Sequence, residues 1–408
     1  MPNLTTVSGS ALEVDFSPQD IFWSRTDKRG VIEFANTVFQ RISAFEWDDL
    51  VGAPHKLVRH ADMPRGVFQL FWDMLKADDP VVAYVKNRTA EGRAYWVLAF
   101  ATPIEDGYVS VRIKPSSALF NKVTQIYQDL RAAEQAEKLS PEESRDRLLA
   151  AIREQGFEDL GDFMANAIAA EVAERAQHID RPTDRLVAQS MSMLSAIRSA
   201  RDHAREISVL FEGIRNVPTN IRILAAQLEQ GSGPISVISN NHGVLSNEML
   251  EGVEAFRAAA KETEAQIRRT LFIAYGAALM REVLQALTHE IELLPDCFDP
   301  VEEMRTQQLR CDSYFAMAQE EFAAIAAQGR HFHEVTAGLK RHVAGLDVTR
   351  IMCKIEQSRL NDNADGLGEI IAYLEKIQAA ISRELVEIEH ASHQIKAAAA
   401  RSTSPQAA

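Results

Sequence analysis

The sequence contains few cysteines and no long hydrophobic run. Its 408 residues include only three cysteines, which are far apart: Cys297, Cys311 and Cys353. This number and spacing exclude a disulfide framework and favour a reducing compartment. The longest apolar stretch, residues 271–280, is too short to span a bilayer and is bounded by Arg269 and Arg281. Because the first residues also lack the basic start and apolar core of a signal peptide, we expect a cytoplasmic protein with no membrane span.

Positive charge is also scarce. The formal net charge is −14, whereas a nucleic-acid partner or a polybasic membrane anchor requires a basic surface. The acidity is uneven along the chain: residues 1–116 carry 13 Lys+Arg and 15 Asp+Glu, and residues 117–408 carry 31 and 43. The charge therefore argues against a nucleic-acid partner, and the second part of the chain carries most of the acidity.

The sequence has none of the common catalytic signatures. It contains no Walker A loop, no GxGxxG segment after a strand, no nucleophile elbow and no kinase or cyclase signature. In the segment HFHE, His331 and His333 are two residues apart and lie on different faces of the predicted helix, so we predict no metal site there. We therefore expect neither an enzyme nor a metalloprotein.

Tryptophan and proline are concentrated in the first part of the chain. All four tryptophans lie within the first 96 residues, and half of the prolines lie within the first 115. Short runs rich in β-branched and aromatic residues, separated by turn signals, predict strands at 21–24, 31–34, 81–87, 94–104 and 108–112. A helical region at about 36–77 separates the second run from the third. This order predicts an α+β domain with a five-stranded antiparallel sheet and flanking helices.

After Pro115 the sequence is dominated by helix-forming residues, and no proline occurs from 301 to 404. Apolar residues at three- and four-residue spacing form a coiled-coil-like seam: Met193, Ile197, Ala200, Ala204, Ile207, Phe211 and Ile214. This pattern predicts a mainly helical coiled-coil or bundle region. The seam suggests a homodimer, although pairing with residues 235–260 of the same chain would satisfy it equally well.

These features divide the chain into six segments. They are an N-terminal extension (1–17), an α+β domain (18–116), a helical connector (117–180), a helical hairpin (181–260), a C-terminal helical region (261–400) and a disordered tail (401–408).

Several segments of the α+β domain resemble the PAS domain of bacterial aerotaxis receptors. They are TDKRGVIEFANTVFQRISAF (26–45), VGAPHKLVRHADMP (51–64), VKNR (85–88), YWVLA (95–99) and YVSVR (108–112). The resemblance covers about residues 18–116, and the second and third segments are its most specific parts. In that family the PAS domain binds FAD non-covalently, and its redox state reports oxygen or electron-transport status. The resemblance thus implies a flavin-based sensor.

Carried over by position, the resemblance nominates a set of cofactor-binding residues: Asn36, Arg59, His60, Asp62, Trp72 and Asn87. In the VKNR strand, alternation sends Asn87 to the face opposite Lys86 and Arg88. We expect Asn87 to face the pocket.

The chemistry of residues 56–72 agrees with a flat anionic ligand. Arg59 and His60 precede a helix whose predicted cap is Asp62, with Pro64 in its first turn. A helix N-terminus beside cations suits an anion such as a pyrophosphate. Side chains at i, i+3, i+4 and i+7 form an apolar wall suited to a ring system: Phe68, Phe71, Trp72 and Leu75. The same residues also have structural interpretations, namely an Arg59–Asp62 ion pair, a hydrogen-bonded histidine and a core tryptophan.

The chain departs from the family pattern at three places. Val81 stands where the family has a tryptophan, Ala61 replaces a proline, and the hairpin at 102–112 is short. These differences keep open the hypothesis of a ligand-free PAS module that serves in dimerisation or docking. Haem bound through His55 or His60 is a further alternative.

Residues 219–246, TNIRILAAQLEQGSGPISVISNNHGVLS, resemble the tip of the cytoplasmic hairpin of methyl-accepting chemotaxis receptors in degenerate form. The family has several more residues between Glu229 and Gly231. Pro218 and Pro234 flank the segment and predict a bent apex, because proline does not suit the middle of a helix. The resemblance implies chemotaxis-type signalling partners.

We therefore predict a cytoplasmic PAS sensor that binds FAD and relays its redox state through the helix after Pro115 to a helical output region. The alternative is a ligand-free scaffold that acts on chemotaxis or other signalling proteins.

Overall fold

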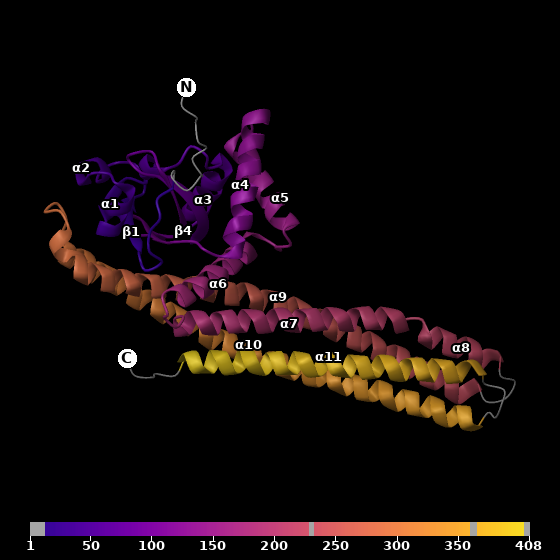
Figure 1. The fold of residues 1–408 in the computed structure, drawn as a ribbon. Helices are drawn as coiled ribbons and strands as arrows, with labels where there is room; N and C mark the ends of the chain where they lie inside the picture. Colours follow the sequence, from indigo (N-terminus) through magenta and orange to yellow (C-terminus); the bar gives the residue numbers. More distant parts are fainter. Residues whose placement is uncertain (1–12, 228–231, 360–364, 404–408) are drawn as a thin grey trace. The chain divides into compact units, whose positions relative to one another are not determined.

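The computed structural model describes residues 13–227, 232–359 and 365–403. It divides into two compact units, Met1–Ala188 with Leu271–Ala318, and Gln189–Thr270 with Gln319–Ala408. Three long helices contribute residues to both units (Figure 1): α7 (Arg185–Ile214), α9 (Ser232–Glu290) and α10 (Pro300–Arg359).

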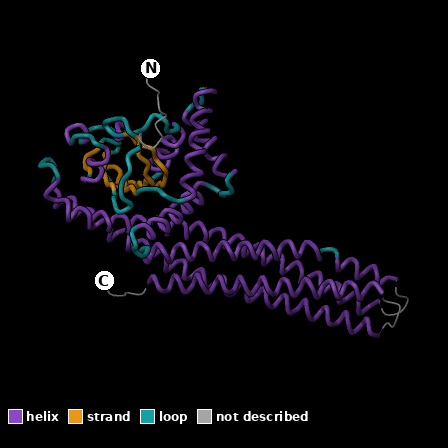
Figure 2. The backbone as a smooth tube through the Cα atoms, viewed as in Figure 1, coloured by secondary structure: helices purple, strands orange, loops and turns teal. Residues whose placement is uncertain are grey.

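A five-stranded antiparallel sheet forms the centre of the first unit in the described chain. Its strands are β1 (Phe22–Asp27), β2 (Ile32–Ala35), β3 (Val81–Arg88), β4 (Ala94–Ile104) and β5 (Gly107–Ile113). They are arranged in the order β2-β1-β5-β4-β3, and every neighbouring pair is antiparallel. Figure 2 shows the strands in orange, enclosed by helices. The predicted α+β fold is confirmed, and the five predicted runs coincide with the five strands.

The predicted helical region at 36–77 contains α1 (Thr37–Ser43), α2 (Trp47–Leu50), the 3₁₀ helix η2 (His55–Val58) and α3 (Arg65–Lys76). These elements cover the inner face of the sheet. One detail of the prediction is wrong: Asp62 does not cap α3. The helix begins at Arg65, its N-cap position is Pro64, and no side chain of that position accepts a hydrogen bond.

The outer face of the sheet is also buried, although antiparallel sheets often leave one face to solvent. On this face the ring of Tyr84 contacts that of Phe120, with centroids 5.6 Å apart. The ring of Phe100 contacts that of Tyr275, with centroids 5.7 Å apart. The cover comes from α4 (Ala118–Glu137), α6 (Leu160–His178) and the parts of α9 and α10 within 271–318, whereas α5 (Pro141–Glu154) packs mainly on α3. Helices therefore cover both faces of the sheet.

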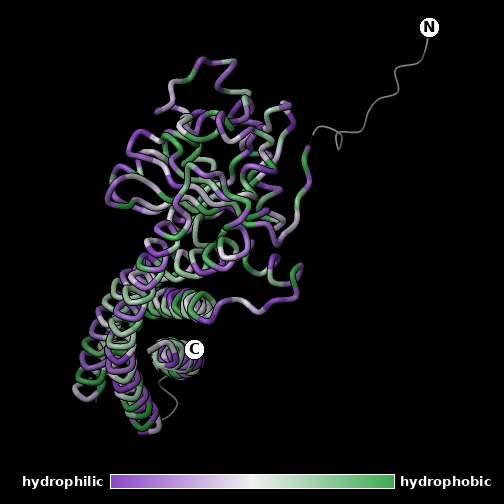
Figure 3. The backbone as a smooth tube through the Cα atoms, turned by 90° about the vertical axis from the view of Figure 1, so that its left-hand side faces the viewer, coloured by the Kyte–Doolittle hydropathy of each residue, from purple (hydrophilic) through white to green (hydrophobic). Residues whose placement is uncertain are grey.

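The second unit is an antiparallel helical bundle. Side-chain contacts join α7 to α9 (Arg198–Glu264), α9 to α10 (Gln266–Glu321), and α10 to α11 (Lys340–Glu389), where α11 spans Asp365–Thr403. His203 of α7 in turn contacts Glu384 of α11. Figure 3 shows hydrophobic (green) and hydrophilic (purple) residues alternating along these helices, as in amphipathic bundle helices.

The predicted seam on α7 is buried inside this bundle. All seven seam residues have side chains that are at most 1% exposed: Met193, Ile197, Ala200, Ala204, Ile207, Phe211 and Ile214. Ser208 on the same helix reaches Glu254 of α9, within the stretch 235–260. The intrachain pairing is thus the one observed, and the seam gives no reason to invoke a second copy.

The receptor-like segment forms α8 (Val217–Gln227) followed by the start of α9. Pro218 and Pro234 lie in the first turns of these helices, where proline is tolerated, and α7 ends before them at Ile214. The apex from Glu229 to Gly231 lies outside the described residues, as do residues 404–408 of the expected tail, whereas residues 401–403 belong to α11.

One helix in the described chain is long and apolar enough by composition to cross a membrane. It spans Gly233–Leu293, and 61% of its most apolar window is buried inside the protein.

Candidate functional site

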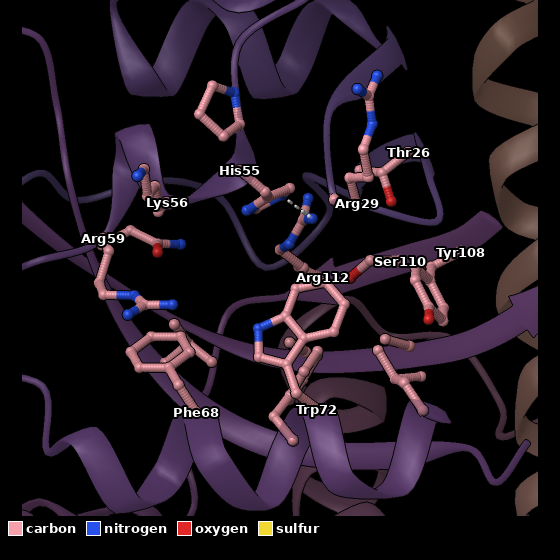
Figure 4. Close-up of a pocket in the computed structure, with 18 residues that line it drawn as sticks. Thr26, Arg29, His55, Lys56, Arg59, Phe68, Trp72, Tyr108, Ser110 and Arg112 are labelled. Carbon is pink, nitrogen blue, oxygen red and sulfur yellow. Dashed lines mark hydrogen bonds between the residues drawn. The ribbon is translucent and has the colours of Figure 1, made fainter. Parts of the chain in front are cut away.

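A cavity of about 260 Å³ lies between the inner face of the sheet and the helices that cover it. Side chains from β1, β3, β4 and β5 form its floor, and η2 and α3 supply the walls (Figure 4). Alternation along β5 sends Tyr108, Ser110 and Arg112 into the cavity and leaves Val109 and Val111 in the core on the other face. The size approaches that of ligand pockets in other proteins.

Helix α3 supplies an aromatic wall. Phe68, Phe71, Trp72 and Leu75 all line the cavity, as the spacing of these residues predicted. The Trp72 ring meets the Tyr108 ring edge to face, with centroids 5.4 Å apart. The other side of Trp72 touches the β1–β2 turn, where a Cβ atom on Gly30 would lie 2.9 Å from the indole. The tryptophan is therefore held in place by packing on two sides.

Arg59 lies beside this wall. Its guanidinium carbon is 3.5 Å from the centroid of the Phe68 ring, which is a cation–π contact. Its Nε is buried without a hydrogen-bond partner in the described chain, and burial lowers the pKa of this arginine. The charge is thus partly desolvated and faces the cavity without a carboxylate partner among the described residues.

Arg112 of β5 is the second cation of the cavity, and its side chain is almost fully buried. Its Nη2 donates to Ser24 Oγ at 2.8 Å and to His55 Nε2 at 2.5 Å, the contact dashed in Figure 4. Its Nη1 has no hydrogen-bond partner among the described residues. Burial lowers the pKa of Arg112 to about 10. An unsatisfied buried guanidinium donor costs free energy unless a ligand or solvent accepts from it.

His55 is the neutral member of this group. Burial first, and the charge of Arg112 second, lower the pKa of its imidazole well below the usual value. Because Nε2 accepts from Arg112, the ring proton resides on Nδ1.

The structure brings Arg59, Trp72 and Asn87 together around the cavity. Asn87 is buried in β3, and its backbone forms an isolated bridge with that of Arg59. It faces the cavity while Lys86 and Arg88 do not line it, as the strand alternation predicted.

His60 and Asp62 lie outside the cavity. The Asp62 carboxylate accepts from Lys86 Nζ at 2.8 Å, and the same hydrogen bond lowers the pKa of Asp62. The His60 Nδ1 accepts from the backbone N–H of Asp62 at 3.1 Å. The ion pair at this loop is therefore Lys86–Asp62, and the Arg59–Asp62 pair considered as a structural alternative is not formed.

Asn36 also lies outside the cavity. Its Oδ1 accepts from the backbone N–H of Trp23 at 2.9 Å and from that of Phe39 at 3.3 Å, and its Nδ2 donates to the carbonyl of Ile21 at 2.9 Å. Asn36 is thus the N-cap of α1, and this role uses its side-chain amide fully.

The N-terminus of α3 is not open to a ligand, contrary to our expectation. Glu134 of α4 accepts from the backbone N–H groups of Arg65 (2.6 Å) and Gly66 (3.3 Å). Ser144 and Arg131 donate to the same carboxylate. Burial raises the pKa of Glu134, but these hydrogen bonds together lower it below its usual value. A protein carboxylate therefore occupies the position that we had predicted for a pyrophosphate.

Arg112, Ser110 and Tyr108 were missed as site residues. The alternation in YVSVR places them on one face, but that pattern alone does not say which face meets the cavity. Val81, by contrast, does not line this cavity. It lies in a separate hollow next to Val67, Tyr127 and Leu148. The family difference at this position therefore does not alter the wall of the main cavity.

The first domain is similar to known proteins. Residues 32–113 match the family model of the PAS fold. The aerotaxis receptor of Escherichia coli K12 is 35% identical over 121 residues, which is 28% of this chain and 24% of that receptor. The chain thus matches about a quarter of the length of this curated relative. The first domain is a PAS domain that is similar to the one in this aerotaxis receptor.

Solved structures that are similar to part of this chain include the LOV domain of a blue-light activated histidine kinase from Erythrobacter litoralis. It has 14% identity and a TM-score of 0.21, covering 22% of this chain and 90% of that chain. A PAS domain from Colwellia psychrerythraea has 14% identity and a TM-score of 0.20, covering 23% and 85%.

Proposed function

We propose that this protein is a cytoplasmic redox or oxygen sensor whose PAS cavity binds FAD non-covalently, and that it is a signalling protein with no enzymatic activity of its own. The observation that carries the proposal is the pair of guanidinium groups, Arg59 and Arg112, which face an aromatic-walled cavity with unsatisfied donors. Such donors need an acceptor or an anion.

The residues of the cavity fit the parts of a flavin nucleotide. The rings of Phe68, Phe71 and Trp72 suit a flat heterocycle, and Asn87 and Arg112 offer donors for its polar edge. Arg29 and Lys56 line the same cavity and are exposed, so they form a cationic rim suited to phosphates. The flavin would supply the redox-active group. This rim replaces the N-terminus of α3 as the proposed phosphate site.

A path for the signal begins at Arg112. Its partner Ser24 lies on β1 next to Arg25, which points to the other face of the sheet and donates to Glu303 of α10 at 3.1 Å. Phe34 on the neighbouring strand stacks on Phe298, with centroids 4.3 Å apart. A ligand whose charge changes on reduction would alter the environment of Arg112. We propose that the sheet passes this change to residues 271–318, which continue into the bundle through α9 and α10.

The same geometry weakens the haem alternative. His55 Nε2 already accepts from Arg112, and His60 lies outside the cavity. The homodimer has no further support, because the seam that suggested it is buried within one chain. Signalling proteins of the chemotaxis type remain the proposed partners, by virtue of the aerotaxis-receptor similarity and the receptor-like α8–α9 segment.

The test is the visible absorption spectrum of the intact purified protein, recorded before and after dithionite and after incubation with FAD. We expect flavin bands that bleach on reduction and that are lost in Arg59→Ala. The matched control is His60→Ala, because this neighbour lies outside the cavity and should leave the bands unchanged. A protein that remains colourless after incubation with FAD would contradict the proposal and favour the ligand-free scaffold.

A further inference from the structure

Two histidines and a glutamate converge where α10 and α11 lie side by side in the bundle. They are His333 of α10 and Glu389 and His393 of α11. One ligand atom from each lies within 4.8 Å of those of the other two. The two imidazole rings are 5.5 Å apart between centroids. The cluster belongs to the second unit and is independent of the PAS cavity.

The helical geometry explains why these side chains meet. Glu389 and His393 are four residues apart on α11, so they lie on one face, one turn apart. His333 approaches from the antiparallel helix α10, and it is separated from this pair by more than fifty residues of sequence. Its sequence neighbour His331 points elsewhere, as the two-residue spacing predicted, since the cluster does not include it. A search for metal-ligand spacing along one segment therefore overlooks the site.

The chemistry of the three groups is that of a transition-metal site. Neutral imidazole nitrogens and a carboxylate oxygen are ligands for Zn²⁺ and related divalent ions. Ligand atoms bound to one ion at about 2.1 Å lie about 3.4 Å apart in tetrahedral geometry. The observed 4.8 Å limit requires movements of only about 1 Å. Both histidines are exposed, so rotation of their side chains can supply these movements.

A protein cation occupies part of the site. Lys340 Nζ donates to Glu389 Oε2. This hydrogen bond, together with the charge of Lys340, outweighs the opposing effect of burial and lowers the pKa of the Glu389 carboxyl. The carboxylate is therefore ionised at neutral pH and available to a metal ion that displaces the lysine.

We propose that His333, Glu389 and His393 form a binding site for a divalent transition-metal ion of the Zn²⁺ class that joins α10 to α11. Three protein ligands leave at least one coordination position for water or an exogenous ligand. Because the ligands come from two helices, the ion binds the assembled bundle in preference to the unfolded chain.

The experiment uses untagged, chelator-treated full-length protein carrying Cys297→Ser, since Cys297 is exposed and thiolates are ligands that compete for transition-metal ions. Titration with ZnCl₂ in a calorimeter, and with CoCl₂ in a spectrophotometer, gives the stoichiometry and affinity. We expect one site per chain, and an upward shift of the thermal unfolding midpoint with added zinc. His393→Ala should weaken binding at least about tenfold.

Matched control variants distinguish zinc binding at the cluster from zinc binding by other exposed histidines. His390 lies on the same helix near the cluster, and its Nε2 contacts Gln394. His331 is two residues from His333. His390→Ala and His331→Ala should bind zinc as the parent does. Helical circular dichroism of each variant checks the fold, and Lys340→Met should strengthen binding because it frees the carboxylate.

Absence of saturable zinc binding by the parent protein would overturn the proposal. So would binding that survives both His393→Ala and Glu389→Gln unchanged, or that is lost in His390→Ala alone. Flavin binding does not enter these outcomes, so they are independent of the proposed sensor function.

Discussion

Two sets of buried charged groups in the first unit differ in how completely their hydrogen bonds are satisfied. On the cavity side, Arg59 and Arg112 keep donors without partners in the described chain. Towards the helices of the connector, the buried carboxylates Glu134 and Glu171 each accept several hydrogen bonds. A charge with a full set of partners specifies how helices dock, whereas a charge with an incomplete set points to a ligand. The contrast therefore separates architecture from function within one domain.

The largest effect is expected for the fully paired carboxylates. Glu171 of α6 accepts from Tyr84 Oη at 2.9 Å, from Ser117 Oγ at 2.6 Å and from the backbone N–H of Ser116 at 2.7 Å. Glu171→Ala leaves these buried donors unsatisfied and should lower the free energy of unfolding by about 3–5 kcal/mol, as measured by urea denaturation. Glu174→Ala, one turn along the same helix, should change it by less than about 0.5 kcal/mol. Equal effects of the two variants would contradict the assignment.

Buried histidines make the free energy of unfolding depend on pH. Burial lowers the pKa of His242, in α9 of the bundle, to about 4. The unfolded imidazole, with its ordinary pKa of 6.5, binds a proton that the folded one does not between these values. The contribution of His242 to the free energy of unfolding should therefore be constant above about pH 7 and fall by up to about 3 kcal/mol as the pH drops from 6.5 to 4.

The variant His242→Leu should lose this part of the pH dependence, and the exposed control His390→Leu should keep it. Denaturation curves collected between pH 4 and 8 give the comparison. An unchanged slope in His242→Leu would show that the titrating group lies elsewhere. The depressed pKa of His55 should add a similar dependence in the PAS domain that changes with FAD, because its partner Arg112 faces the cavity.

A smaller effect is expected from the glycine that supports Trp72. Gly30 has a φ of +79°, and a Cβ atom there would lie 2.9 Å from the indole. Gly52 has a φ of +78° but nothing within 4 Å of such an atom. Both Gly→Ala variants should lose about 1–2 kcal/mol from backbone strain. Only Gly30→Ala should also displace Trp72 and weaken FAD binding, as followed by quenching of flavin fluorescence. Equal FAD affinity of the two variants would remove Trp72 from the proposed wall.

The smallest effect on stability is expected at the proposed relay. Arg25 is partly exposed and pairs with the buried Glu303 of α10, which Arg310 also contacts. Because Arg310 still compensates the carboxylate, Arg25→Gln should cost only about 1 kcal/mol. FAD affinity should not change, because Arg25 does not line the cavity. Hydrogen exchange of residues 291–299 should differ between oxidised and reduced protein, and this difference should shrink in the variant. A redox difference that the variant leaves intact would place the relay on another contact.

The sequence predicted what depends on local pattern. The five strand runs, the apolar face of α3 and the inward direction of Asn87 all follow from periodicity, and each is present in the structure. The resemblance to aerotaxis-receptor PAS domains gave Arg59 and Trp72 as candidate ligands, and both line the cavity.

Local sequence patterns could not predict the contacts between segments that are distant in the sequence. Glu134 is 69 residues from Arg65 in the sequence, yet its carboxylate accepts the hydrogen bond at the N-terminus of α3. It occupies the position that we had predicted for the Asp62 cap and for a pyrophosphate. Arg112 gains its significance only from meeting His55 and Ser24. In the same way, His333 meets His393 only because α10 and α11 fold together. Each of these contacts depends on tertiary structure rather than on spacing along the chain.

The most direct test of the central claim is a titration of the apoprotein with FAD, combined with urea denaturation, for the parent, Arg112→Met and Arg88→Met. Arg88 is exposed and does not line the cavity. We predict that Arg112→Met weakens FAD binding at least about tenfold and lowers the free energy of unfolding of the apoprotein by no more than about 2 kcal/mol, because the loss of the hydrogen bonds to Ser24 and His55 is offset by removal of a buried charge that lacks a full set of partners. Arg88→Met should match the parent. A parent protein that does not bind FAD, or an Arg112→Met variant that binds it normally but unfolds several kcal/mol more easily, would show that the arginine is structural and would contradict the account.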